Sequence, residues 1–489
     1  MTASDLLLRG ARTYGGGEPL DVRLSGGLVG SVAPAGVLDP EGAETIDLDG
    51  RFVGPGLWDA HVHFTQWVIQ QRRVDLAGTR SASDAVAVVR QALVNGFPTT
   101  DGVLFGYGYR DGLWNEPTTQ AALDVFAQPV VLINGDLHSA WMNSAGAARL
   151  GLHPDPSGVV SEGEWIGVLQ RFHTESVLPV ADYRTAAEAA AARGVIGIVE
   201  YENVLNIDEW AERVAGGVDS LRVDAAVWPD ELDTALGRGL RTGDPVEPSG
   251  LVTMGRLKVV VDGSLNTRTA YCWDPYPGLD AHAAHSCGVS SIPVSQLRDL
   301  LVRARAGGIQ AAVHAIGDRA NTEVLDTFEE LGMPGIIEHA QLVRSDDFAR
   351  FARLGLIASV QPEHAMDDRD VADRYWAGRT GRAFAFGSLH AAGVALRLGS
   401  DAPVAPLDPW HAIASAVVRS RGERDPWHPE QSLPLDVALA ASTRHPLAAG
   451  APADIVVTDA DPFELGRDAL RAMPVAATLL AGRFTHRAL

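Results

Sequence analysis

Apolar runs recur along the middle of the chain, each directly after a glycine that ends a helix-like segment. TAAEAAAARG meets VIGIVEYEN at Gly194, and FARFARLG meets LIASVQPEH at Gly355. A glycine just past a helix end supplies a left-handed cap, and a β-rich run directly after it is typical of the second half of a β-α-β unit. This alternation of helices and strands predicts a parallel sheet.

Eight apolar runs fit this cycle as strands. They span residues 57–63, 195–201, 221–228, 256–262, 309–314, 335–339, 356–361 and 395–401. Eight parallel strands with intervening helices are typical of an α/β fold, the (β/α)8 or TIM barrel. The active site of such a barrel lies at the carboxyl ends of its strands, so polar residues there are candidates for chemistry.

Two parts of the chain do not follow the cycle. Residues 64–180 form a long insertion between the first and second strands. Residues 1–55 and 448–489 read as short β segments separated by Gly-Gly and Asp-Gly turns, which is typical of hairpins. We expect the two ends to pair into one small β domain, beside a barrel that spans residues 56–447.

The composition narrows the range of partners. The 489 residues include 40 Lys and Arg against 62 Asp and Glu, a formal net charge of -22. This charge opposes binding to nucleic acid or to an anionic membrane, so we expect a small-molecule substrate and, at most, association with copies of itself as in a homodimer. We find neither a signal peptide nor an apolar run of the roughly 18 residues needed for a membrane span, and expect a cytoplasmic protein. Cys272 and Cys287 are too few for a disulfide framework or a thiolate metal site.

Histidines and an acid stand at the ends of the predicted strands. His61 and His63, in GLWDAHVHF, share one face of the first strand because alternate side chains point the same way. His314, His339 and Asp401 end the fifth, sixth and eighth strands. A single histidine in such a position is commonly a core residue, but imidazole and carboxylate groups converging on one rim suit Zn²⁺ and other divalent ions. The sequence therefore predicts a metal site.

Lys258 lies within the apolar fourth strand, RLKVVVDGSL. A lysine in such a strand is usually salt-bridged, or extends its ammonium group to water. An ammonium group cannot bind a metal, so a ligand role would require Lys258 to lose its charge by taking up CO2 as a carbamate. The residues alone leave both alternatives open.

Several further motifs carry a resemblance to a known family. The chain resembles the amidohydrolase superfamily, and within it the YtcJ-like branch (amidohydrolase family 3), which includes N-substituted formamide deformylases. The resemblance extends over nearly the whole chain and rests on DAHVHF (59–64), GDLHSAWMNSAGA (135–147), KVVVDGSLNTRTA (258–270), HAIGDRA (314–320), EHAQLV (338–343), QPEHAMDD (361–368) and GSDAPVAPLDP (399–409).

The resemblance implies one or two divalent metal ions, with Zn²⁺ expected, although the ligands would also suit Fe²⁺, Mn²⁺ or Ni²⁺. It assigns His61, His63 and Asp401 to the first ion and His314 and His339 to the second. A carboxylated Lys258 would bridge the two ions. The branch also has a long insertion after the first strand and a small β-sandwich domain, which the 64–180 segment and the terminal β segments match.

These assignments predict hydrolysis of a C–N bond in an amide, an N-formyl amine or a cyclic amide. A bound divalent ion would activate water, and Asp401 would take the proton and deliver it to the leaving nitrogen. Alternatives are an esterase, a carbamate hydrolase or a deaminase of the same fold, or a non-catalytic regulator on a relic barrel. A relic need not retain every ligand, whereas this chain does.

Substrate contacts are expected from the loops above the barrel. His138 and Trp141, in the insertion, could reach over its mouth, and Gln361 and His364 follow the seventh strand. For His138 and Trp141 the alternative is that they pack the insertion onto the barrel.

Overall fold

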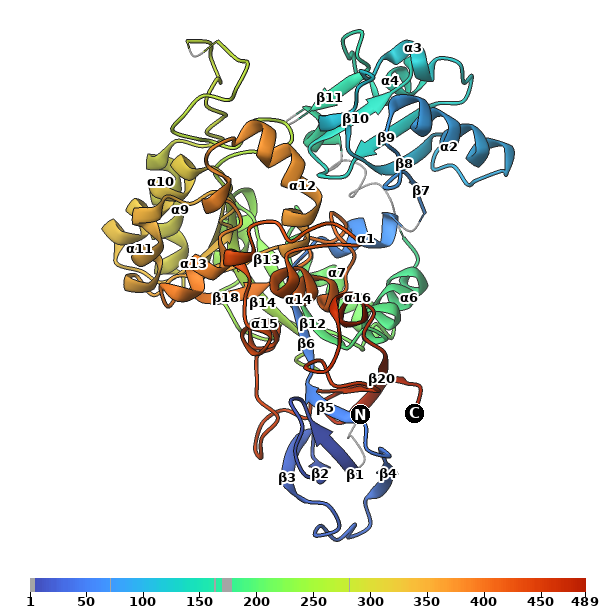
Figure 1. Cartoon of the computed structure of the whole chain (residues 1–489), viewed down its shortest axis with the longest axis vertical. Coiled ribbons are helices and arrows are strands. Elements are labelled where there is room, and N and C mark those ends of the chain that lie inside the picture. Colours follow the sequence, from blue (N-terminus) through green and yellow to red (C-terminus); the bar gives the residue numbers. More distant parts are fainter. Residues whose placement is uncertain (1–4, 71, 162–163, 169–177, 281) are drawn as a thin grey trace.

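The computed structural model describes residues 5–70, 72–161, 164–168, 178–280 and 282–489. Its centre is an eight-stranded parallel sheet with strand order β18-β17-β16-β15-β14-β13-β12-β6 (Figure 1). The strands are β6 (Leu57–Val62), β12 (Val195–Glu200), β13 (Arg222–Val227), β14 (Val252–Val260), β15 (Ala311–Ala315), β16 (Ile336–His339), β17 (Ile357–Val360) and β18 (Ala395–Leu398). Each of the eight predicted strands is present, and the predicted barrel fold is confirmed.

The sheet curls until its two edge strands, β18 and β6, meet. The backbone NH of Asp401 donates to the carbonyl of His61 at 2.8 Å, and the NH of His63 donates to the carbonyl of Ala402 at 2.8 Å. Gly399 permits this approach, because a Cβ at that position would lie only 2.7 Å from the backbone nitrogen of His61. The seam therefore depends on a residue without a side chain.

Helices cover the outside of the barrel, and each buries one face. In α9, for example, Leu297, Leu300, Leu301 and Ala304 are buried at the spacing of an amphipathic helix. The helices of this part are α6 (Val180–Ala191), α7 (Ile207–Ala215), α8 (Leu232–Gly237), α9 (Val294–Ala306), α10 (Asp318–Leu331), α11 (Phe348–Arg353), α12 (Pro362–Tyr375), α13 (Phe386–Ala391), α14 (Pro409–Val418), α15 (Leu435–Ala441) and α16 (Arg467–Arg471). Short 3₁₀ turns are η2 (Pro229–Glu231), η3 (Ser345–Asp347), η4 (Thr380–Arg382) and η5 (Pro429–Gln431).

Both ends of the chain contribute to a separate sheet below the barrel in Figure 1. Its strand order is β21-β20-β19-β5-β1-β2-β3, with β4 paired to β1. The apolar residues Leu8, Val22, Ile455 and Leu479 belong to its own buried core. The strands are β1 (Leu6–Thr13), β2 (Leu20–Ser25), β3 (Leu28–Pro34), β4 (Glu44–Asp47), β5 (Phe52–Pro55), β19 (Ile455–Thr458), β20 (Val475–Leu480) and β21 (Arg483–Arg487).

The insertion after β6 carries a third sheet, with strand order β11-β10-β9-β8-β7, above the barrel in Figure 1. The Tyr107 hydroxyl at its base contacts the carbonyls of Gly135 at 2.9 Å and Pro403 at 2.7 Å, so it joins the insertion to the loop after β18. The elements of the insertion are α1 (Phe64–Gln70), β7 (Val74–Asp75), α2 (Ala82–Val94), β8 (Leu104–Tyr109), η1 (Asp111–Leu113), α3 (Gln120–Leu123), β9 (Val130–Asn134), β10 (Ser139–Met142), α4 (Ser144–Leu150) and β11 (Val159–Ser161). In the part of the chain that the structure describes, no helix combines the length and apolarity that crossing a membrane requires.

The barrel seam makes a testable prediction. Gly399→Ala forces a methyl group against the backbone of His61, and we expect the free energy of unfolding to fall by about 1–3 kcal/mol. Gly381→Ala is the matched control, since a Cβ there meets no atom within 4 Å. Urea unfolding of both variants measures the effect, and equal midpoints would contradict the role of Gly399.

Candidate metal centre

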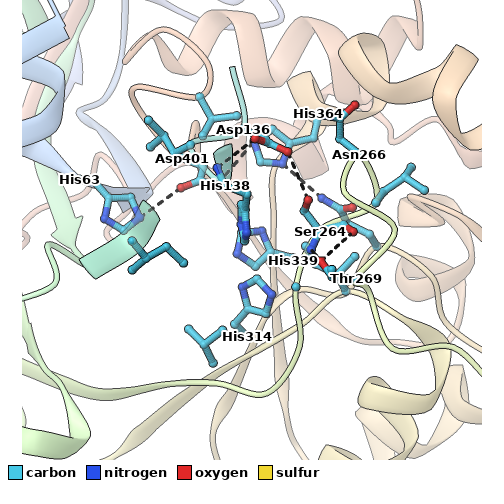
Figure 2. A pocket seen from close by; sticks show the side chains of 18 of the residues that line it. His63, Asp136, His138, Ser264, Asn266, Thr269, His314, His339, His364 and Asp401 are labelled. Carbon is cyan, nitrogen blue, oxygen red and sulfur yellow. Dashed lines mark hydrogen bonds and ion pairs between the residues drawn. The ribbon is translucent and has the colours of Figure 1, made fainter. Parts of the chain in front are cut away.

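A cavity of about 500 Å³ opens at the carboxyl ends of the barrel strands. We call it the carboxyl-end cavity. Each of the six residues predicted as metal ligands contributes to its lining, and Figure 2 shows several of them converging on it. The six are His61, His63, Lys258, His314, His339 and Asp401.

Three of these side chains approach one another closely enough to share an ion. One ligand atom from each of His61, His339 and Asp401 lies within 4.8 Å of the others. Oδ1 of Asp401 is 3.5 Å from Nε2 of His61 and 3.4 Å from Nε2 of His63. His61, His339 and Asp401 are all buried, so their ligand atoms are held away from bulk water.

The state of the imidazoles fits a metal ligand set. Burial is the main cause that lowers the pKa values of His61 and His339 well below the ordinary value, which leaves both rings neutral, as coordination requires. Among the described residues, no hydrogen-bond partner reaches the buried Nδ1 of His339 or Nε2 of His364. Buried polar atoms are normally paired, so the donor set is consistent with a divalent cation among these rings.

An unusual backbone conformation places His339. Ile336 packs in the barrel interior and Ile337 packs outward in the main core, so alternation puts Glu338 inside and would turn His339 outward. His339 instead has a φ of 72°, which brings its ring into the carboxyl-end cavity. A left-handed conformation at a residue other than glycine costs about 1–3 kcal/mol and is characteristic of functional sites.

Glu338 holds His61 from behind, a role that the sequence did not reveal. Nδ1 of His61 donates to Oε2 of Glu338 at 2.6 Å, and the hydroxyl of Tyr201 donates to Oε1 at 2.9 Å. The bond fixes the tautomer of His61 and leaves Nε2 facing the cavity. The available signal was an acidic residue inside an apolar strand, the same signal that singled out Lys258.

Lys258 lies beside this pair. Its Nζ is 3.2 Å from Nε2 of His61 and 4.3 Å from the ring centroid of Tyr201. Burial lowers the pKa of Lys258 to about 8, which increases the fraction of neutral amine. This position is compatible with either of the alternatives that the sequence left open, a plain lysine or a carbamate.

The predicted substrate contacts divide into two groups. His138 and His364 line the carboxyl-end cavity (Figure 2). Trp141 and Gln361 are not among the described residues that line this cavity, and their contact with a substrate stays a prediction. Trp141 is fully buried within the insertion, where Nε1 donates to the carbonyl of Thr119 at 3.0 Å. Gln361 is buried directly after β17, and its Nε2 donates to the carbonyl of Ser359 at 3.4 Å.

The wall of the carboxyl-end cavity also contains polar residues that the sequence did not single out. They come from the insertion, from the loop after β14 and from α12. Ser264 donates to Oδ2 of Asp136 at 3.2 Å across the cavity (Figure 2). The Arg110 guanidinium pairs with Asp367 at 3.1 Å and with Asp368 at 3.5 Å. Much of the remaining wall is apolar, formed by Leu137, Ile166, Val260, Leu265, Val289, Ile316 and Val404. The charged Arg110 is thus neutralised by the protein itself, and apolar wall remains for a substrate.

The role of Glu338 can be tested by Glu338→Gln. The amide preserves the shape of the side chain but removes the carboxylate that orients His61, and we expect metal affinity to fall by about 10- to 100-fold. Glu209→Gln, on the exposed face of α7, is the matched control. Competition titration against a metal chelator measures the affinity. An affinity equal to that of the control would refute the positioning role.

Known proteins share this architecture. A family model described as the amidohydrolase family matches residues 44–486. Putative amidohydrolase YtcJ of Bacillus subtilis is 29% identical over 490 residues, covering 91% of this chain and 90% of that protein. N-substituted formamide deformylase of Arthrobacter pascens is 27% identical over 525 residues, covering 94% of each chain. The crystal structure of an uncharacterized metal-dependent hydrolase from Pyrococcus horikoshii superposes with a TM-score of 0.77 at 26% identity, covering 95% of this chain and 99% of that one. The resemblance drawn from the motifs is thereby confirmed, and the chain belongs to the amidohydrolase family.

Proposed function

We propose that the protein hydrolyses a C–N bond in a neutral amide, an N-formyl amine or a cyclic amide, with a metal-activated water and a proton carried by Asp401. The observation that carries this proposal is the approach of His61, His339 and Asp401 within 4.8 Å of one another at the bottom of a cavity with apolar walls. The proposal includes a small-molecule substrate and a cytoplasmic location.

The residues that would hold the metal are those already described. His61, His339 and Asp401 would supply the first ligands, with His63 and His314 beside them. When bound, a divalent ion such as Zn²⁺ supplies Lewis acidity, which lowers the pKa of water towards about 7 and polarises a carbonyl group.

Asp401 is placed to handle the proton. Burial alone would raise its pKa, but the interaction with His63, whose own pKa is raised, acts against burial, and the pKa of Asp401 lies below the ordinary value. The group is therefore a carboxylate at neutral pH, which is the ionisation state that a metal ligand and a proton acceptor both require. Its Oδ2 lies 3.7 Å from Nε2 of His364, and both residues line the carboxyl-end cavity, where Asp401 would pass the proton to the leaving nitrogen.

The walls support an uncharged substrate with an apolar substituent. Arg110 is paired with Asp367 and Asp368, so it is not free to bind an anionic substrate group. The residues Leu137, Leu265 and Val289 offer apolar contact. The Arthrobacter relative is described as a deformylase of N-substituted formamides, which agrees with this reading of the pocket.

A matched set of substrates tests the proposal. We expect the purified, metal-containing protein to release amine from N-butylformamide or to open a simple lactam. Butyl formate, which has the same substituents around an ester bond, tests the esterase alternative, and ammonia release from an aminated heterocycle tests the deaminase alternative. Loss of amide hydrolysis on chelation and its return with added Zn²⁺ would support the metal requirement.

Asp401→Asn should lower kcat by about 10²- to 10⁴-fold, because the amide cannot accept the proton. Metal content is measured in the same sample, since Asp401 is also a proposed ligand. Asp346→Asn, whose side chain is 89% exposed, is the control. An unchanged kcat in Asp401→Asn at full metal occupancy would exclude Asp401 as the proton carrier.

The number of ions depends on Lys258. If Lys258 is carboxylated, crystals grown with bicarbonate should show additional density on its Nζ, and the protein should hold about two metal ions per chain. Lys258→Gln should then retain about one. A bare Lys258 and a single ion in the unaltered protein would instead assign Lys258 as a plain lysine.

A further inference from the structure

A second cavity, of about 310 Å³, lies at the amino ends of the barrel strands. We call it the amino-end cavity. It shares no lining residue with the carboxyl-end cavity among the described residues. Its walls come from the interior faces of β6, β12, β13, β14, β16, β17 and β18 and from the segment 441–445 after α15. Exposed His445 belongs to this segment, so the cavity has a route to solvent that does not pass the metal centre.

Three arginines line this cavity: Arg256, Arg397 and Arg444. Among the described residues, an acidic partner is present for Arg444, which pairs with Asp224 at 2.7 Å. For Arg256 and Arg397, the described part of the chain offers no carboxylate within 4.0 Å. This is unusual in a chain whose acidic residues outnumber its basic residues by 62 to 40.

The arginines also lie close enough to repel one another. Burial, followed by repulsion from Arg444 and Arg256, lowers the pKa of Arg397. Glu338 is the other acid in the lining, but its two oxygens already accept from His61 and Tyr201. Three guanidinium groups thus face two carboxylates, which leaves one positive charge in excess.

The rest of the lining is apolar. Val199, Tyr201 and Ile336, with Ile357 against them, form an apolar cluster in the barrel interior, and the Arg444 guanidinium covers the ring of Trp58 at 3.2 Å from its centroid. The cavity volume of about 310 Å³ is the volume that about ten water molecules occupy in liquid water. The space therefore exceeds that of a simple inorganic anion and would also receive a small hydrocarbon body.

We propose that the amino-end cavity binds a small monocarboxylate, with the carboxylate between Arg256 and Arg397 and its apolar body against Val199, Ile336 and Ile357. A guanidinium group matches a carboxylate through two parallel N–H···O bonds, and one bound anion balances the single excess charge. This is a binding site separate from the proposed hydrolytic centre, and it does not depend on which bond that centre cleaves.

Isobutyrate is the probe, with isobutanol as the neutral control of the same carbon skeleton. Calorimetric titration of the metal-containing protein should show saturable binding of one isobutyrate per chain and none of isobutanol. Arg256→Gln and Arg397→Gln should each weaken isobutyrate binding by at least about 10-fold, because each removes a charged hydrogen-bond donor. Arg238→Gln, which loses only a surface pair with Asp208, should bind as the unaltered protein does.

Two results would overturn the proposal. One is the absence of saturable binding. The other is full-strength binding in both cavity variants, which would place the carboxylate at the metal centre instead. If the variants do not fold, as judged by circular dichroism, crystals of the unaltered protein soaked in isobutyrate decide the question. Density between Arg256 and Arg397 supports the site, and an amino-end cavity without it refutes the site.

Discussion

The site depends on the hydrogen bond that joins the two edges of the barrel. The NH of Asp401 donates to the carbonyl of His61 at the seam between β18 and β6, so two residues separated by 340 positions in the chain become neighbours. Gly399 allows the strands to approach, and the seam then brings the Asp401 carboxylate to 3.5 Å from Nε2 of His61. Closure of the fold and assembly of the candidate ligand set are thus the same physical event.

Much of this arrangement could be predicted from the sequence, because its signal is local. An apolar run that ends in histidine or aspartate marks both a buried strand and the end of that strand, and the barrel rule then collects those ends. On this basis the sequence predicts His314, His339 and Asp401 at the rim, and all three line the carboxyl-end cavity. The family resemblance added the ordering of these residues into a ligand set.

Other features could not be predicted because they depend on contacts between distant segments. Glu338 and His339 are adjacent, and strand alternation would put their side chains on opposite faces. The left-handed backbone at His339 instead brings its ring to the cavity that His61 also lines. The indole of Trp141 would suit a pocket wall. Its burial beside Tyr109, however, is decided by how the insertion folds on itself. Arg256 and Arg397, for which the described residues offer no carboxylate partner, come from separate strands and form no motif.

The hydroxyl of Tyr107 links the insertion to the carbonyl of Pro403, two residues beyond Asp401. Segments that recognise substrates are often regarded as modules that can be exchanged between relatives on a constant catalytic scaffold. Here the exchange would remove a support of the loop that carries the proposed proton carrier. An insertion exchanged with another barrel would therefore keep this hydrogen bond only if Tyr107 and the loop around Pro403 were transferred together. The insertion and the position of Asp401 are thus linked through one hydroxyl group.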